Sequence, residues 1–358
     1  MIKALSTLIA ALVVVLGLIG LFLWKQVSDF PDKKMAGDGE LVDFEIARGM
    51  PFEKMASLLE EKGLVSSAFF LKAHNKQHEF VSKIKSGEYR LANNLAPKDI
   101  IAALVKGAKE EHVRVTLKEG LHMLEIFEEI EKKEIASKEE LLKLAVDPEF
   151  LGGHGITGQN IDGYLFPETY QFKKATPPKK VLDRLIEEHK KVWARVLANH
   201  SEAYEKQKND LGWNDFQFLT MASIVEKEAV VDEERARIAQ VFINRLISDS
   251  FVPHRLDTDP TIRYGCMVAT PESKGCKNWK WTDRLRRAQL DDDENTYNTY
   301  QHEGLPPGPI CNPGEKSMAA TINSDGSSFF FFVARNDGTH IFSKTRQDHE
   351  KAVDKYQR

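Results

Sequence analysis

The sequence has few cysteines and no surplus of positive charge. Three of its 358 residues are Cys, which is too few for a disulfide scaffold. Its 50 Lys and Arg residues stand against 54 Asp and Glu, for a net charge of −4, so the chain has no basic excess for binding nucleic acid phosphates. With 42% hydrophobic and 29% charged residues, the composition is that of a globular protein. At about 150 residues per domain, the length predicts two or three folded units.

Several catalytic motifs are also absent. The sequence contains no P-loop, no GxSxG, no GxGxxG and no four-cysteine zinc pattern. His74 and His78 have the i, i+4 spacing of a metal-binding pair, but no third ligand is evident near them and HExxH does not occur. We therefore expect these to be surface histidines, and we expect neither a metal nor an organic cofactor.

One long apolar run stands near the start, at residues 4–24. A helix of this length reaches about 30 Å, the thickness of a bilayer core. The run ends in Phe22-Leu23-Trp24-Lys25, which lacks the small residues of a signal-peptide cleavage site. The sequence therefore predicts an uncleaved transmembrane anchor. Because the leader of residues 1–3 is so short and no second run follows, we expect an N-terminus in the cytoplasm and everything after residue 25 outside it.

Residues 41–108 alternate between short strands and helices, after a polar linker at residues 25–40 that contains Pro and Gly. Period-2 and period-3.6 apolar patterns, with helix-ending Gly and helix-starting Pro, predict a small α/β module. We expect strands at residues 42–46 and 87–91 and helices at residues 51–62, 66–75 and 97–106.

Residues 109–358 carry a larger set of mixed elements, so the fold class expected for the whole chain is α+β. We expect strands at residues 112–117, 329–334 and 340–342, and helices at 123–133, 137–146, 179–198, 215–229 and 235–246. Ser137 and Glu140 predict a capping box at one of these helices. The apolar strand at 329–334 is expected to be buried, the helix at 215–229 to be half-buried, and residues 257–261 to form a polar loop.

Two glutamates end the helix expected at residues 215–229. Glu226 and Glu228 lie about 200° apart around a helix, so they cannot form a catalytic carboxylate pair with each other. The apolar positions place both at the edge of the buried face, while Lys227 points to solvent. A partly desolvated glutamate has a raised pKa, which suits a general acid. Periodicity does not choose between the two glutamates, and an ordinary surface pair at a helix end fits it as well.

Further along, aromatic residues alternate with hydrogen-bonding ones. Tyr297-Asn298-Thr299-Tyr300 is one such stretch, and a polar segment from Asp257 leads to Tyr264. Aromatic faces beside amide and hydroxyl groups suit sugars, whose rings have apolar faces and polar edges. Turn formation and core packing account for the same residues equally well.

Several motifs then occur in a fixed order along nearly the whole chain. They are DGYLFPETY at residues 162–170, MASIVEKE at 221–228, VFINRL at 241–246, DPT at 259–261, YNTY at 297–300, GLPPGPI at 304–310 with NPG at 312–314, and the FFFFVA hairpin with His340. Together with the anchor and the small module, they resemble the membrane-anchored endolytic murein transglycosylases, the YceG-like family.

The resemblance implies a LysM-like module at residues 41–108 and a YceG-like catalytic domain at residues 109–358. It also implies a bacterial inner-membrane protein with its body in the periplasm or cell-wall space. Its implied partners are peptidoglycan glycan strands, the peptidoglycan synthases known as penicillin-binding proteins, and the elongation or division machinery; no nucleic acid is implied.

The implied activity is that of a lyase, a lytic transglycosylase that cleaves the MurNAc–GlcNAc β-1,4 bond of nascent strands. The product end is 1,6-anhydro-MurNAc, which terminates strand elongation. The family's catalytic glutamate is the second of its EKE motif, which falls on Glu228. As both acid and base it needs no second carboxylate, because the substrate's own C6 hydroxyl is the nucleophile. We expect the substrate-binding residues to be Glu226, Asp259, Thr261, Tyr264, Tyr297, Asn298 and Tyr300.

The sequence departs from the family at residues 266–281. Cys266 and Cys276 close a small disulfide loop at the rim of the cleft or remain free thiols, depending on whether this side of the membrane is oxidising. Cys311 would then be the odd thiol. Two other functions compete with the transglycosylase. One is a hydrolase at the same bond, with Asp257 or Asp259 as the second carboxylate, and the other is a non-catalytic, membrane-anchored glycan-binding scaffold.

Overall fold

The computed structural model describes residues 2–107, 112–268 and 271–357, with side chains from Val15 onward except Gln77. The chain divides into two compact units, Met1–Glu111 and His112–Arg358. The predicted boundary between the module and the catalytic domain, at residues 108 and 109, falls outside the described residues.

The first unit begins with helix α1 (Ile2–Asp29), which contains the predicted anchor at residues 4–24. The side chains of residues 4–14, and residue 1 of the predicted cytoplasmic leader, lie outside the described residues. Between Leu16 and Trp24 the large apolar side chains of α1 are exposed. Among the residues that the structure describes, no helix is long and apolar enough to cross a membrane.

The rest of this unit is a strand pair covered by helices. Strands β1 (Leu41–Ile46) and β2 (Gly87–Ala92) are antiparallel, and α2 (Phe52–Glu61) and α3 (Ala68–His78) lie between them in the sequence. A 3-10 turn at Val81–Lys83 precedes β2, and α4 (Pro97–Lys106) follows it. Alternate residues of β1 are buried, as period 2 requires. The buried core contains Phe30, Phe44, Ile46, Met55, Leu59, Leu71, Tyr89, Ile100 and Leu104.

The second unit contains two hydrophobic cores. The first lies around an antiparallel pair, β3 (His112–Thr116) and β4 (Thr169–Lys173), and the helices α5 (Met123–Lys132), α6 (Lys138–Ala145) and α7 (Pro148–Gly153). The long helix α8 (Pro178–Asn199) contributes Val181 and Leu185 to this core. It then contributes Val192 and Val196 to the other one. Helix α8 therefore belongs to both cores.

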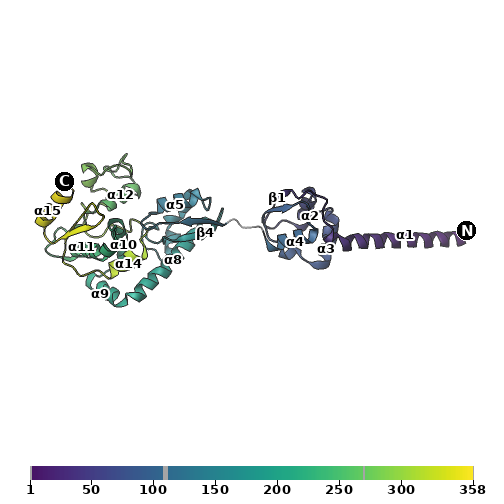
Figure 1. Cartoon of the computed structure of the whole chain (residues 1–358), viewed down its shortest axis with the longest axis horizontal. Coiled ribbons are helices and arrows are strands. Elements are labelled where there is room, and N and C mark those ends of the chain that lie inside the picture. The colour runs from purple at the N-terminus through teal and green to yellow at the C-terminus, as the bar shows by residue number, and fades with distance from the viewer. Residues whose placement is uncertain (1, 108–111, 269–270, 358) are drawn as a thin grey trace. The chain divides into compact units, whose positions relative to one another are not determined.

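The second core surrounds helix α10 (Asp215–Glu228), which packs against α11 (Arg235–Ile247) and α14 (Glu315–Ile322) (Figure 1). The hairpin of β5 (Phe331–Ala334) and β6 (His340–Ser343) packs on α11 and against the last helix, α15 (Arg346–Tyr356). The remaining elements are α9 (Ser201–Leu211), the 3-10 turn Asp232–Glu234, α12 (Asp259–Val268) and α13 (Arg287–Leu290).

The mixed α+β fold class is confirmed, and most of the expected helices and strands occur within a few residues of their expected bounds. Helix α10, however, is not half-buried. Every residue from Phe218 to Val225 is buried, because neighbouring elements cover all its sides. The polar loop expected at residues 257–261 was wrong as well. Asp259 begins helix α12, and Pro260 occupies its first turn, where proline is tolerated.

Two smaller expectations also fail. Ser137 stands at the N-cap of α6, but its side chain makes no capping hydrogen bond; instead the Lys138 amide donates to Glu131 Oε1 at 2.9 Å. The strand expected at residues 329–334 covers only Phe331–Ala334, and Val333 is its one buried residue. Most side chains of this hairpin are therefore half-buried rather than fully enclosed in the core. Strand β4 was not expected, since its partner β3 is more than 50 residues away.

Candidate active site

The carboxyl end of α10 brings the two candidate glutamates into the second core. A capping box fixes the start of the helix, since Gln217 N donates to Asn214 Oδ1 at 3.1 Å and Asn214 N donates to Gln217 Oε1 at 3.0 Å. The buried run from Phe218 to Val225 then holds the helix on all sides. The last residue of the helix, Glu228, is therefore rigidly placed.

Glu228 is half-buried as a residue, with its carboxyl group turned inward, and among the described residues that carboxyl has one hydrogen-bond donor. The Thr258 hydroxyl donates to Glu228 Oε1. Burial raises the pKa of Glu228, and the negative charge of Asp259 raises it further, while the Thr258 bond and the charges of His340 and Arg245 lower it without cancelling the rise. The negative end of the helix dipole also disfavours the carboxylate here. Glu228 is thus a carboxyl that holds its proton to higher pH than an exposed glutamate does.

Glu228 forms part of the wall of a cavity of 240 Å³. The opposite walls come from the β5–β6 hairpin and from α15. The other lining residues are Phe332, Val333, Ala334, His340, His349, Val353 and Gln357. The lining thus combines apolar side chains of the hairpin with polar groups, among them the Glu228 carboxyl and two histidines.

His340 faces this cavity and is held by a second carboxylate. Its Nδ1 lies 2.7 Å from Glu234 Oε2, and its backbone N–H donates to Glu234 Oε1 at 3.0 Å. Both side chains are nearly buried, at 6% exposure for His340 and 14% for Glu234. Because Glu234 occupies Nδ1, the remaining ring nitrogen of His340 is the one available to a ligand.

Glu226 lies on the other side of α10, among partners that bind its charge. Its Oε2 accepts from Ser317 Oγ at 2.7 Å and from Gly314 N at 3.1 Å. Its Oε1 lies 3.4 Å from Arg235 Nη1, in an ion pair whose side chains are only 7% and 9% exposed. The two glutamates therefore have no common partner, as their spacing on the helix predicts.

Lys227 does not point to solvent as expected. It is half-buried, and its Nζ donates to the Gly120 carbonyl at 3.1 Å. The ring of Trp281 lies 5.9 Å from the same Nζ. Lys227 is covered because Gly120 and Trp281, which are far from α10 in the sequence, lie over this side of the helix end.

Of the other expected substrate-binding residues, Asp259 and Tyr300 lie nearest Glu228. The Tyr300 hydroxyl donates to Asp259 Oδ1 at 3.0 Å. The negative charge of Asp259 raises the pKa of Glu228, and the negative charge of Glu228 contributes to the raised pKa of Tyr300. Asp259 is exposed. Thr261 lies just behind them and is fully buried, with its hydroxyl bonded to the Thr258 carbonyl at 2.7 Å. Thr261 is therefore not at the protein surface, and its hydroxyl helps to hold Thr258 in position.

Tyr264, Tyr297 and Asn298 are buried away from the cavity. Tyr264 packs edge-on against Tyr297, with ring centroids 4.9 Å apart. Asn298 is fully buried, and its amide nitrogen donates to the carbonyls of Gln289, Leu290 and Asp292, in and just after helix α13, at 2.8 to 3.1 Å. These three residues hold the loops around α12 in place, and the structure does not bring them to Glu228.

Tyr264 also bonds a buried acid that the sequence did not single out as a site residue. The Tyr264 hydroxyl donates to Asp162 Oδ2 at 2.7 Å, while Asp162 Oδ1 accepts from Met123 N at 2.7 Å and from Asn312 Nδ2 at 3.1 Å. Asp162 is fully buried, and burial raises its pKa to about 7 against the lowering effect of these bonds. Asp162 therefore ties together segments of the chain that meet behind α12.

The sequence did not indicate that Thr258, Glu234 and His340 belong to the site around Glu228. His340 was noticed only as part of a motif, and Glu234 only as an acidic residue near a helix start. No local pattern links them, because their partners are separated by 30 residues for Thr258 and Glu228 and by 106 for His340 and Glu234.

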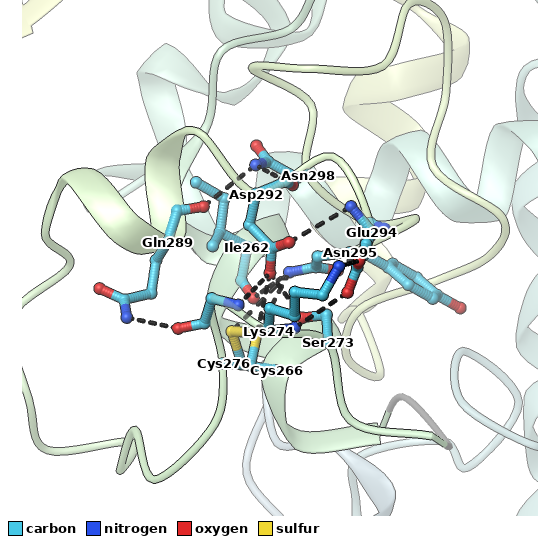
Figure 2. Close-up of a disulfide and its surroundings, with 12 residues drawn as sticks. Ile262, Cys266, Ser273, Lys274, Cys276, Gln289, Asp292, Glu294, Asn295 and Asn298 are labelled. Carbon is cyan, nitrogen blue, oxygen red and sulfur yellow. Dashed lines mark hydrogen bonds and ion pairs between the residues drawn. A yellow bond between two sulfur atoms is a disulfide. The ribbon is translucent and has the colours of Figure 1, made fainter.

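Cys266 and Cys276 form a disulfide, which decides the alternative that the sequence left open (Figure 2). Cys311 is the buried free thiol, and its Sγ donates to the Ser223 carbonyl at 3.3 Å. In the described part of the chain, no three His, Cys, Asp or Glu side chains converge as metal ligands would. The absence of a metal or cofactor stays a prediction, as do the roles of the site residues.

The chain is similar to several known proteins. An endolytic murein transglycosylase of Bacillus subtilis (strain 168) is 29% identical over 329 residues, which cover 88% of this chain and 84% of that protein. One of Streptococcus pneumoniae (strain ATCC BAA-255 / R6) is 25% identical over 363 aligned positions, covering 93% of this chain and 62% of that longer protein. The crystal structure of a yceG-like protein from Listeria monocytogenes, 28% identical, superposes with a TM-score of 0.55 over 88% of this chain and all of that one.

The family profile spans almost all of the second unit and most of the small module. The profile described as YceG-like family matches residues 44–355, and this stretch includes both glutamates of α10 and every residue lining the cavity beside Glu228 except Gln357. The chain therefore belongs to the YceG-like family.

Proposed function

We propose that this protein is an endolytic peptidoglycan lytic transglycosylase. It cleaves the MurNAc–GlcNAc β-1,4 bond within nascent glycan strands, leaves 1,6-anhydro-MurNAc ends and so terminates strand elongation. The observation that carries the proposal is Glu228, a buried carboxyl with a raised pKa in the wall of a small cavity. Among the described residues lining that cavity, Glu228 is the only carboxylic acid, which fits a reaction that needs one.

In this mechanism Glu228 acts twice. Its protonated carboxyl gives the proton to the glycosidic oxygen as the bond from C1 of MurNAc to that oxygen breaks. The C6 hydroxyl of the same MurNAc then bonds to C1, and its proton passes to the Glu228 carboxylate, so the enzyme returns to its starting state. No water enters the product, so the new end is lighter by one water than a hydrolysed end. The Thr258 hydroxyl orients the carboxyl for both steps.

Other residues of the site hold the sugar. His340, fixed by Glu234, turns its free ring nitrogen to the cavity and bonds a sugar hydroxyl or the N-acetyl group. Asp259 and Tyr300, joined by a hydrogen bond, form the edge next to Glu228. Thr261, Tyr264, Tyr297 and Asn298 act behind this edge by keeping α12 and its neighbouring loops in position.

The test uses the full chain on uncrosslinked glycan strands, with Glu228→Gln as the matched variant and mass spectrometry of the new ends as the readout. Anhydro ends from the unchanged protein alone are the expected result. Reducing ends would instead indicate a hydrolase and direct attention to Asp257 and Asp259. Strand binding without cleavage by either protein would favour the non-catalytic scaffold.

We further propose that α1 anchors the protein in the inner membrane, with its body in the periplasm or cell-wall space. The exposed apolar side chains between Leu16 and Trp24 support this, since they have no partner surface within the described part of the first unit. Fusing a reporter active only outside the cytoplasm to Arg358 tests the orientation. An inactive reporter, or a protein that salt alone releases from membranes, would contradict it.

The small module is proposed to be LysM-like and to bind glycan. Its strand–helix–helix–strand order and antiparallel pair support this, together with a cavity of 440 Å³ between β1 and α2. Met50, Leu58 and Lys54 are among its lining residues. The module would hold a strand near the membrane for the catalytic domain and the penicillin-binding proteins. Loss of strand binding in Leu58→Glu, with cleavage of short oligosaccharides retained, is the expected result.

A further inference from the structure

A strongly basic segment follows helix α12 in the sequence of this acidic protein. Residues 274–287, here called the basic loop, contain six Lys and Arg and only one acidic residue, whereas the whole chain has a net charge of −4. Lys277, Lys280 and Arg284 are exposed, and among the described residues they have no ion-pair partner. Like charges concentrated this way repel one another unless a ligand of opposite charge is bound.

The basic loop is held firmly at its start. The disulfide ties Cys276 to the end of α12, and the buried Asp292 carboxylate accepts from Ser273 Oγ at 2.5 Å and from Gly275 N at 3.1 Å (Figure 2). Gln289 Nε2 donates to the Gly275 carbonyl at 2.6 Å. The side chains that follow are therefore presented from a rigid base, as a binding site requires.

From this base the loop brings the Trp281 ring near two cations. The Arg263 guanidinium carbon lies 5.9 Å from the Trp281 ring centre and 5.5 Å from that of Trp279, and Lys227 Nζ lies 5.9 Å from the Trp281 ring. Arg263 Nη1 donates to the Trp281 carbonyl at 3.0 Å. Both cations bond to backbone carbonyls, and in the described part of the chain neither has a carboxylate partner. Two half-buried positive charges are thus left without a counter-charge.

Trp279 carries a further unused group. Its indole Nε1 is buried, with no hydrogen-bond partner among the described residues. A buried N–H without an acceptor is energetically unfavourable. A ligand that supplies an acceptor oxygen to this aromatic and cationic cluster would remove that deficit.

The cluster adjoins the proposed acid through two helices. Lys227 immediately precedes Glu228 on α10. Arg263 lies one turn after Asp259 on α12, a rise of about 6 Å, and Asp259 is the residue whose charge acts on Glu228. Lys227 and Arg263 are thus each within one helical turn of a residue at the proposed acid, so the substrate of that acid is the ligand to consider for them.

We propose that Lys227, Arg263, Trp279, Trp281 and those cations of the basic loop that have no described ion-pair partner form a subsite for a carboxylate-bearing sugar unit, namely a muramyl residue with its peptide attached. The indoles contact the sugar and the cations bind carboxylates of the peptide. The inference rests on the proposed function for its substrate and adds a preference for peptide-bearing over peptide-free strands. Arg suits this role because its planar guanidinium pairs with carboxylates through two parallel hydrogen bonds.

The experiment measures binding rather than turnover. The full chain with Glu228→Gln, kept in solution with a mild detergent, is titrated calorimetrically with a MurNAc–GlcNAc tetrasaccharide carrying its peptides, and with the same sugar after the peptides are removed. We expect the peptide-bearing ligand to bind about tenfold more tightly, the scale of one charge-assisted hydrogen bond. Adding Arg263→Gln or Lys227→Gln should remove most of this preference. Arg287→Gln is the matched control, because Arg287 lies in the same loop but pairs with Asp291.

Three results would overturn the proposed subsite. Equal affinity for the two ligands, or equal weakening of both by Arg263→Gln and Lys227→Gln, would overturn the subsite. So would loss of binding to vesicles of anionic lipid in these variants with the sugar preference unchanged, since the cluster would then serve a membrane surface. Lys227→Gln keeps the test valid if Arg263→Gln disturbs the loop. A peptide preference in a protein that never cleaves strands would support the subsite and reject the proposed catalysis.

Discussion

The two sides of the α10 end differ sharply, although they carry the same residue type only two positions apart. Glu226 meets Arg235, Ser317 and a backbone N–H, so all its partners bind the charged form. Glu228 meets one hydroxyl, a neighbouring negative charge and a cavity, so its pKa is raised. The first environment stabilises a fold and the second prepares a proton donor. Identical side chains thus acquire different chemistry from their surroundings alone.

The largest effect is expected from Glu228→Gln. The amide can still accept from Thr258 but cannot transfer a proton, so kcat should fall by about 10³-fold, within the range of general acid–base catalysis. The unfolding midpoint in urea should stay close to that of the unchanged protein. Retained cleavage in this variant would move the acid elsewhere.

Glu226→Gln should lower the stability of the fold rather than the rate of cleavage. Removing the carboxylate takes away one of the two ion-pair partners of buried Arg235, whose Nε still lies 3.0 Å from Asp232, so we expect a loss of about 2 kcal/mol in the free energy of unfolding. Urea unfolding measures this loss, and kcat per folded molecule should change little. Glu315→Gln is the control, because Glu315 pairs with Arg195 at the exposed surface and its loss should matter far less. A variant of Glu226 that folds normally but loses activity would reverse the assignment of the two glutamates.

A third buried carboxyl, Asp162, sharpens the comparison because it has only neutral donors around it. Its pKa is raised to about 7, so above the unfolded-state value of 3.8 the folded protein holds a proton that the unfolded chain has lost. Stability is then highest at low pH for this group and falls by about 1.4 kcal/mol per pH unit until pH 7. Asp162→Asn should flatten this part of the curve of unfolding free energy against pH. An unchanged slope would mean that Asp162 is ionised throughout.

The smallest effects concern the pH dependence of cleavage. Because Glu228 must be protonated to act, kcat/KM should fall as pH rises through its pKa. Asp259→Asn removes a charge that raises this pKa, so the alkaline limb should move to lower pH. Thr258→Val removes a bond that lowers it, so the limb should move to higher pH. Shifts in the same direction for both variants would contradict this electrostatic account.

Elements with a strong local pattern could be predicted from the sequence. The helix at residues 97–106 matches α4 because Pro97 and Gly107 mark its two ends, and the strands of the small module follow their alternation. Strand β4 and helix α12 were missed for different reasons. Residues 169–173 become a strand only through a partner far away, and the polar residues around Pro260 resemble a loop although they suit a helix start.

The candidate site was predicted less completely than the fold. Glu228 was selected by resemblance to a family, and its cavity could not be foreseen, since the cavity is built from β5, β6 and α15. Several expected sugar contacts, such as Tyr264 and Asn298, are buried, and their role in binding sugar stays a prediction. Aromatic and amide residues serve both purposes, so their order along the chain does not distinguish a surface from a core.

The sequence alone determined that Glu226 and Glu228 lie on opposite sides of one helix, because about 100° per residue is a property of the local backbone. Its ordered motifs also indicated the family. Only the tertiary structure decided which glutamate is neutralised by an ion pair and which is buried beside a cavity. The reason is that pKa depends on burial and on neighbouring charges, and here those neighbours, Arg235, Ser317, Thr258 and His340, come from segments 9 to more than 100 residues away.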